Sequence, residues 1–148
     1  MILLDAYAVL AALSGEAAAE RVRQLLTGDE PCRMSAVGVV EVLDRLIRIA
    51  GLEPDVAVLG LAELRLLEPA PLHGVVARRA GLLRAAHYDR RTRSVSLADC
   101  VLAATAQTSS GSVATADPHL LELCHAEGIE VVALPGSSGA TWSPAPGQ

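Results

Sequence analysis

The chain has 148 residues, a length typical of one compact domain, and its 51% apolar content suffices for a sizeable core. Its net charge of −5 excludes a histone-like polycation but not a nuclease, which gathers its acids in the active site. Three widely spaced cysteines without a C-x-x-C pair argue against a disulfide framework or a zinc site. We therefore expect reduced thiols and a cytoplasmic protein, without a signal peptide or a membrane-spanning segment.

Short apolar runs alternate with helical patterns along the chain. The apolar run at residues 2–4 predicts a buried strand that ends at Asp5. A stripe of apolar residues at helical spacing predicts a long helix from Ser35, which can cap it, to Ala50. Expected strands cover residues 2–4, 32–35, 66–68, 113–116 and 131–134. Expected helices cover residues 6–13, 16–26, 35–50, 54–64, 72–86, 96–106 and 118–127.

This alternation predicts an α/β protein in which helices flank a parallel sheet. Right-handed crossovers place the carboxyl ends of the strands at one edge, where such sheets form their functional sites. We assign residues 1–134 to one domain. Residues 135–148 are rich in Ser, Gly and Pro, and we expect them to form a flexible tail.

Two acidic side chains in the first half of the chain are candidate site residues, and each also has an ordinary structural role. Asp5 ends the first strand and could simply cap the following helix. Glu41 precedes Arg45 by four residues in the long helix. It could form only an exposed ion pair there, which contributes about 0.2–0.5 kcal/mol.

Two further acids lie in the second half of the chain. Asp99 follows Ser96 by three residues, which is the spacing of a capping box, but its helical neighbours are strongly apolar. A carboxylate that enters a core in this way needs a partner. Asp117 directly precedes Pro118 and could cap the next helix. A cap and a ligand role are compatible, because a carboxylate has several lone pairs.

The four acids carry more information as a set. Asp5 and Asp117 follow predicted strands and Asp99 opens a helix beside them, so these three should share the carboxyl edge of the sheet. Carboxylates packed together repel each other and raise their own pKa values, and a hard divalent cation relieves that repulsion. Mg²⁺ or Mn²⁺ prefers oxygen ligands, and such an ion can activate water against a phosphodiester.

The order Leu-Leu-Asp5, Val-Val-Glu41-Val, Leu-Ala-Asp99 and Thr115-Ala-Asp117 resembles the PIN-domain nucleases. The stretch Ser-Ala-Val-Gly-Val-Val-Glu-Val resembles their bacterial VapC-type toxins, and the resemblance covers residues 1–134. It implies a three-layer α/β/α sandwich with a central, mainly parallel sheet. It also implies a Mg²⁺- or Mn²⁺-dependent endoribonuclease that hydrolyses RNA as the toxin of a toxin–antitoxin pair and is inhibited by its cognate antitoxin.

The resemblance also implies roles for individual residues. Asp5 and Asp99 would be the leading metal ligands, and Asp117 would complete the cluster directly or through water. Glu41 would hold a second metal ion or orient the attacking water. Thr115 would support the site through its hydroxyl group.

Three departures from the family pattern support an alternative. Ala6 and Tyr7 follow the first acid, where the family usually has Thr or Ser; Gly38 stands where Asn is common, and Ala98 where Gly often precedes the third acid. The loss of supporting hydrogen bonds would suit a catalytically weak or inactive PIN-like module that binds partners. A flavodoxin-like or receiver-like regulatory domain also gathers acids at a sheet edge, but this chain lacks lysine and a Gly-rich loop.

Several features concern partners. A cluster of arginines is either an electrostatic track for an RNA backbone or the solvated face of a helix and loop. Its members are Arg78, Arg79, Arg84, Arg90, Arg91 and Arg93. Apolar helices in the first half could expose a groove for an antitoxin segment or for a second copy in a homodimer. His119 lies two residues from Asp117 and could approach the site, although a surface position is the ordinary interpretation.

Overall fold

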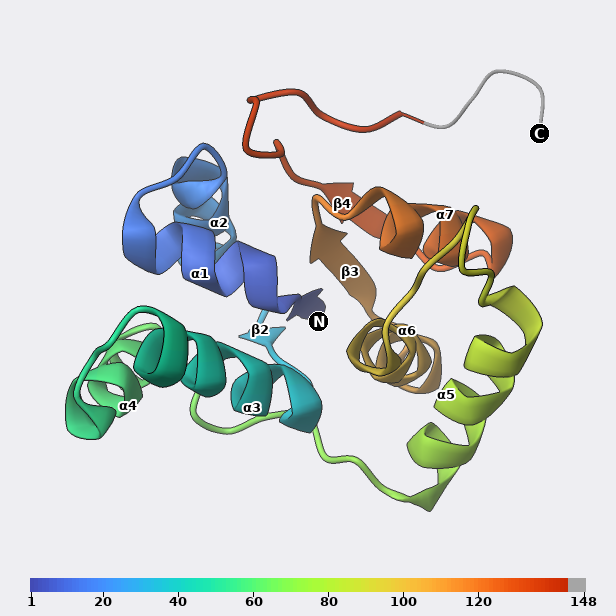
Figure 1. Ribbon diagram of the computed structural model, residues 1–148, viewed down its shortest axis with the longest axis horizontal. Helices are drawn as coiled ribbons and strands as arrows, with labels where there is room; N and C mark the ends of the chain where they lie inside the picture. The colour runs from blue at the N-terminus through green and yellow to red at the C-terminus, as the bar shows by residue number, and fades with distance from the viewer. Residues whose placement is uncertain (144–148) are drawn as a thin grey trace.

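A four-stranded parallel sheet forms the centre of the protein in the computed structural model, which describes residues 1–143. The strand order is β2-β1-β3-β4, so β1 and β3 are neighbours in the middle of the sheet (Figure 1). Leu3 pairs with Arg33 on one side and with Val113 on the other. The strands are β1 (Ile2–Leu4), β2 (Cys32–Arg33), β3 (Ser112–Thr115) and β4 (Val131–Ala133).

Seven α-helices surround the sheet in the part of the chain that the structure describes: α1 (Ala6–Ser14), α2 (Ala19–Leu26), α3 (Ala36–Asp44), α4 (Pro54–Glu63), α5 (Gly74–His87), α6 (Leu97–Ser109) and α7 (Pro118–Ala126). Four of them begin at a side chain that accepts a hydrogen bond from the first turn, as the sequence predicts. These caps are Asp5 for α1, Ser35 for α3, Ser96 for α6 and Asp117 for α7.

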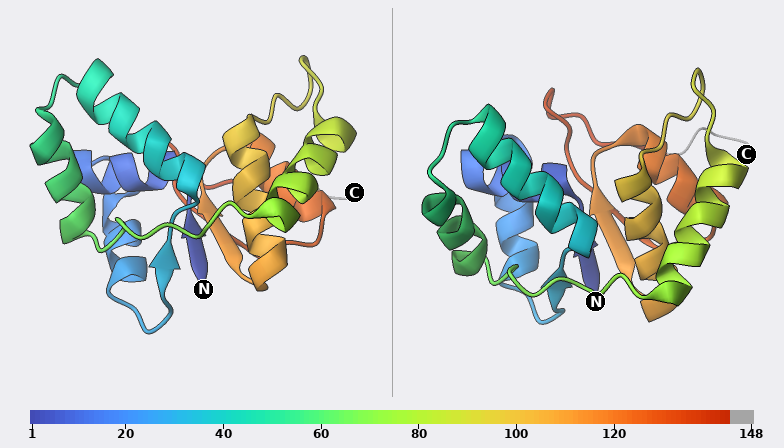
Figure 2. Two further views of the ribbon diagram at one scale, coloured as in Figure 1. Left: turned by 90° about the horizontal axis from the view of Figure 1, so that it is seen from below. Right: turned by 60° about the horizontal axis from the view of Figure 1, so that its bottom comes forward.

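The two faces of the sheet support two separate apolar clusters, because successive residues of a strand point to opposite faces. Ile2 and Leu4 pack with α1, α2, α3 and α4 on one face. Leu3 and Val113 pack with α5, α6 and α7 on the other. Figures 1 and 2 show these two groups of helices on opposite sides of the strands. The predicted α/β/α sandwich with a parallel sheet is therefore confirmed.

The strand expected at residues 66–68 is wrong. Arg65 has a φ of 59°, so the chain turns in the left-handed region just before this segment. Leu66 is buried in the first apolar cluster as part of a connection, and Pro69 follows without an N–H to donate. In this connection, only Ala70 pairs with another segment of the protein, in an isolated parallel bridge to Ser35.

The single long helix expected from Ser35 to Ala50 is interrupted. The α-helix ends at Asp44 and continues as a π-helical turn, η1 (Arg45–Ile49). The N–H of Ala50 donates to the carbonyl oxygen of Arg45, five residues earlier, at 2.9 Å. The apolar stripe predicts a helix here but does not distinguish a π-helical turn from a regular one, because it does not show which carbonyl oxygen accepts from each N–H.

The segment after β4 contacts the first helix. The hydroxyl of Tyr7 donates to the carbonyl oxygen of Pro135 at 3.1 Å, and Pro135 bridges to Thr141. The boundary at residue 134 and the flexible tail stay predictions, and residues 144–148 lie outside the described residues. No helix within residues 1–143 is both long enough and apolar enough to cross a membrane.

Candidate active site

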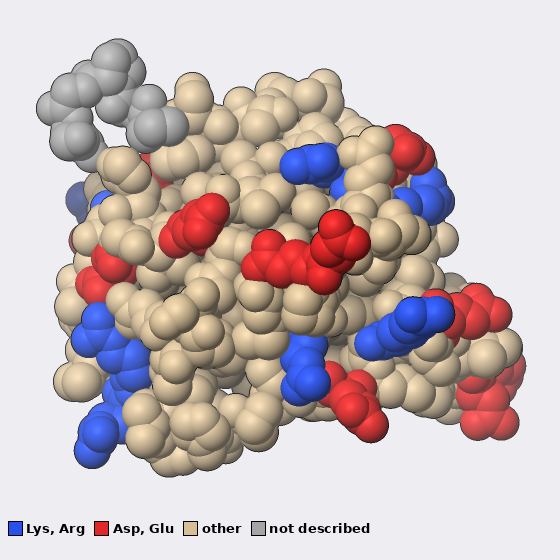
Figure 3. Space-filling model, turned by 180° about the vertical axis from the view of Figure 1, so that it is seen from behind, with Lys and Arg blue, Asp and Glu red and all other residues tan. Residues whose placement is uncertain are grey.

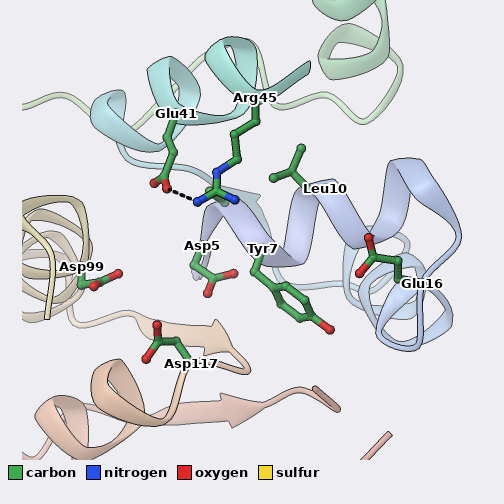
Figure 4. A pocket seen from close by; sticks show the side chains of 9 residues that line it. Asp5, Tyr7, Leu10, Glu16, Glu41, Arg45, Asp99 and Asp117 are labelled. Carbon is green, nitrogen blue, oxygen red and sulfur yellow. Dashed lines mark hydrogen bonds and ion pairs between the residues drawn. The ribbon is translucent and has the colours of Figure 1, made fainter. Parts of the chain in front are cut away.

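One pocket at the carboxyl ends of the central strands brings together the four acids that the sequence singles out. Asp5 directly follows β1 and Asp117 follows β3, which is its neighbour in the sheet. Asp99 lies in the first turn of α6, and Glu41 lies in α3. Figure 4 shows the four carboxylates around a common space. The pocket has a volume of about 330 Å³. The remaining lining residues are Ala6, Tyr7, Leu10, Glu16 and Arg45.

Asp5 is the most deeply buried of these acids, with 9% of its surface exposed. Its carboxylate accepts hydrogen bonds from the N–H of Ala8, at 2.7 Å, and from the hydroxyl of Thr115. Burial raises the pKa of Asp5 to about 7; these two hydrogen bonds oppose the shift, and the charges of Asp99 and Asp117 add to it. Without a bound metal ion, Asp5 is therefore partly protonated near neutral pH.

Asp99 and Asp117 both accept hydrogen bonds at the starts of helices and face the pocket. The N–H of Ser96 donates to Asp99 Oδ2 at 2.6 Å, which completes the predicted capping box. Asp117 Oδ1 accepts from the N–H of His119 at 2.7 Å. These bonds use only part of the hydrogen-bonding capacity of each carboxylate. The local signals that start α6 and α7 thus also fix where the two acids lie.

Thr115 connects two of the acids. Its hydroxyl donates to Asp5 Oδ2, and its Oγ1 accepts from the N–H of Asp117 at 2.9 Å. Thr115 is fully buried at the end of β3. The side chain therefore holds the Asp5 carboxylate and the backbone at Asp117 in one arrangement.

Three polar or charged pocket residues are not among the residues predicted for the site. The sequence indicates Arg45 only as an ion-pair partner of Glu41, yet its position one helical turn later places it in the same pocket. That i,i+4 spacing is the signal that could have identified it. Tyr7 lies beside Asp5 and Glu16 lies at the far side of the pocket, as Figure 4 shows, and no local pattern marks them.

The departures from the family pattern meet beside the acids. Gly38 and Ala98 line a small hollow together with Ser35, Asp5 and Asp99. A Cβ atom at position 38 would lie 3.3 Å from both the Met34 Cε and the Ser35 Oγ atoms. A larger polar side chain at this position would therefore require its neighbours to move.

The donor set suits a hard divalent cation, because every acid in the pocket offers carboxylate oxygens and burial disfavours the unpaired charge of Asp5. Within residues 1–143, no three Asp, Glu, His or Cys side chains already stand in positions that could hold a metal ion. Asp5, Asp99 and Asp117 each accept a hydrogen bond from the start of their own helix. The residues fit such an ion by the chemistry of their carboxylate oxygens.

The arginine cluster does not form one free track. Arg79 donates to Glu127 at 2.8 Å, Arg84 stacks 3.8 Å above the ring of Tyr88, and Arg93 contacts Glu122 at 3.7 Å. These three side chains are engaged within the fold. On the face in Figure 3, basic side chains lie in separate patches among acidic ones. His119 is not one of the residues that line the acidic pocket.

Thr115→Val tests whether the hydroxyl of this buried side chain orders the acids. Valine has nearly the same shape but cannot donate to Asp5. We expect any metal-dependent activity of the pocket to fall about 10- to 100-fold, as for other groups that orient ligands. Thr105→Val is a matched control, because Thr105 is also buried but bonds only the Val101 carbonyl oxygen within its own helix. Equal losses in both variants would contradict this role.

Comparison with known proteins places the chain in a family. A sequence model of the PIN domain matches residues 2–126. FitAcB of Neisseria gonorrhoeae is 24% identical with a TM-score of 0.64, covering 88% of this chain and 96% of that one. VapBC2 of Rickettsia felis, bound to a DNA fragment from its promoter, is 14% identical with a TM-score of 0.68 and coverages of 90% and 99%.

A third solved structure with a similar fold is that of a toxin. The VapC20 toxin of Mycobacterium tuberculosis, which cleaves the sarcin-ricin loop, is 17% identical with a TM-score of 0.64. The match covers 82% of this chain and 94% of that one. At these identities the likenesses establish the fold alone. No curated protein sequence matches the chain.

Proposed function

Since this chain belongs to the PIN domain family, we propose that it is a metal-dependent endoribonuclease, the toxin of a toxin–antitoxin pair in the cytoplasm. The observation that carries the proposal is the single pocket lined by Asp5, Glu41, Asp99 and Asp117, which come from four separate elements. Three of these acids also accept hydrogen bonds at the starts of helices, but that role alone would not require them to meet. The RNA-cleaving toxin among its structural neighbours supports the same activity.

We propose that Asp5, Asp99 and Asp117 hold Mg²⁺ or Mn²⁺, with Glu41 as a further ligand or as the group that orients the attacking water. Such an ion supplies Lewis-acid stabilisation of charge on the phosphodiester and lowers the pKa of bound water. Glu41 suits the water-orienting role because its side chain is 36% exposed at the pocket. Thr115 keeps Asp5 turned towards the pocket through its hydroxyl group.

The proposed protein partner is a cognate antitoxin, and exposed apolar side chains on α3, η1 and α4 support it. Val40 and Ile49 are 66% and 64% exposed, and Val56 and Leu59 of α4 are 53% and 56% exposed. Single exposed apolar residues are ordinary, but this group lies on consecutive helices. An amphipathic segment of a partner could cover it. A symmetric homodimer also remains part of the proposal.

A catalytically weak module that binds partners is the second candidate. Gly38 and Ala98 favour it, because neither can supply a side-chain hydrogen bond beside Asp5 and Asp99. Ser35 is the hydroxyl residue in that hollow, but its Oγ already accepts from the N–H of Gly38 at 3.0 Å. The two candidates differ in whether RNA is cleaved at all.

Cleavage of end-labelled structured RNA separates the two candidates. The purified chain should produce discrete fragments with Mg²⁺ or Mn²⁺ and none with EDTA, because the acids cannot activate water without the ion. Cleavage should return when the metal ion is restored. A protein that binds an antitoxin-like partner but leaves the RNA intact under every metal condition would support the inactive module instead.

A further inference from the structure

Arg45 is the only cation among the described residues that line the acidic pocket. The other charged lining residues are five carboxylates, those of Asp5, Glu16, Glu41, Asp99 and Asp117. In Figure 4 the guanidinium of Arg45 lies between Glu41 and Leu10, above Asp5, and a dashed line joins it to Glu41. A single positive group in this position needs an explanation beyond general solubility.

The ion pair between Arg45 and Glu41 is weak. One contact of 3.4 Å joins them, and their side chains are 53% and 36% exposed. Arg48 makes a better pair with Asp44 on the same stretch of helix, with two bonds of 2.8 and 2.7 Å. Exposed ion pairs such as Arg45–Glu41 are screened by water and separate easily. Glu41 therefore does not hold Arg45 firmly, and the guanidinium can exchange one anion for another.

An RNA strand in this pocket needs such a cation. The negative charge of these five carboxylates repels a phosphate that approaches them. The guanidinium group presents a planar fork of N–H donors that matches two phosphate oxygens. The backbone marks the same position, because the π-helical turn starts at Arg45 and such turns often occur at functional sites.

We propose that Arg45 binds a phosphate of the RNA strand in the pocket and exchanges Glu41 for that phosphate when the substrate enters. This inference deepens the proposed function and rests on it. The exchange leaves the carboxylate of Glu41 free to act on the attacking water or on the metal ion. Arg45 is thus a substrate-binding residue of the pocket, and Glu41 is its resting partner.

The test compares Arg45→Ala and Arg45→Lys with the matched control Arg48→Ala. Arg48 carries the same charge on the same helix and has its own acidic partner, but it does not line the pocket. In an Asp99→Asn background, anisotropy of fluorescent single-stranded RNA in Mg²⁺ reports binding without cleavage. Arg45→Ala should weaken binding about 10- to 100-fold, the range for a lost hydrogen bond to a charged group. The slope of log affinity against log salt should become shallower by about 0.7, one phosphate contact with a single strand.

The remaining outcomes decide between explanations. Arg45→Lys should fall between the wild type and Arg45→Ala, because lysine keeps the charge but not the fork. In the active chain, Arg45→Ala should raise KM more than it lowers kcat, and Arg48→Ala should stay within about twofold of the wild type. Equal losses of RNA affinity in Arg45→Ala and Arg48→Ala would overturn the inference. Tighter RNA binding by Arg45→Ala would also overturn it, because Arg45 would then hinder RNA binding to the pocket. If the wild type neither binds nor cleaves RNA, the proposed function itself fails.

Discussion

Asp99→Asn should lower RNA cleavage by about two to three orders of magnitude and leave the fold intact. Asparagine keeps an oxygen that can accept from the N–H of Ser96, so the start of α6 should survive. The substitution removes one negative charge from the pocket, so the metal ion would bind less tightly. Such an ion contributes several kcal/mol of transition-state stabilisation, and part of this would be lost. About 1.4 kcal/mol corresponds to a tenfold change in rate. Initial rates on labelled RNA with Mg²⁺ or Mn²⁺ measure the loss.

Asp89→Asn is the matched control for this experiment. Asp89 also accepts backbone hydrogen bonds at the start of a turn, from the N–H groups of Arg91 and Thr92, both at 2.8 Å. It does not line the acidic pocket. Its variant should cleave RNA at nearly the wild-type rate. If Asp99→Asn retains full activity with normal circular dichroism, the assignment of the active site is wrong.

The regular parts of the fold follow from local patterns that the sequence shows directly. The apolar run before Asp5 predicts β1, and the Ser96 and Asp99 spacing predicts the start of α6; both are confirmed. Where the prediction was wrong, the chain departs from regular geometry. Arg65 adopts a positive φ, and η1 inserts a wider turn. Neither depends on the apolar pattern, so neither could be predicted from it.

The meeting of Asp5, Asp99 and Asp117 was predictable for a topological reason, whereas Glu41 joined them only through the family resemblance. Asp5 and Asp117 follow parallel strands, and such strands end at the same edge of a sheet. The role of Arg45 was less accessible, since an i,i+4 pair with Glu41 reads as an ordinary surface feature. Only the three-dimensional pocket shows that one member of that pair faces four other carboxylates. Sequence patterns therefore locate the acids better than they locate Arg45, the residue whose positive charge opposes theirs.

Asp5→Asn is expected to abolish cleavage while it stabilises the metal-free protein at pH 8. The folded state raises the pKa of Asp5 to about 7 from an ordinary value of 3.8. Between these values the folded state binds more protons than the unfolded state, so its stability falls as the pH rises from about 4 to 7. Above pH 7 the full cost of the buried charge is present. Asparagine carries no charge and escapes this cost.

The size of the gain follows from the same shift. One pKa unit corresponds to about 1.4 kcal/mol, and the amide at position 5 must also rearrange its bond with Thr115. We therefore expect a net gain of about 1–3 kcal/mol for Asp5→Asn at pH 8 in EDTA, measured by urea denaturation. The gain should vanish near pH 4, where Asp5 is protonated in the wild type. Added Mg²⁺ or Mn²⁺ should stabilise the wild type but not the variant, because a ligand that binds only the folded state stabilises it. A variant less stable than the wild type at pH 8 without metal would show that burial does not oppose the charge of Asp5. This proposed metal ligand would then carry no cost in stability.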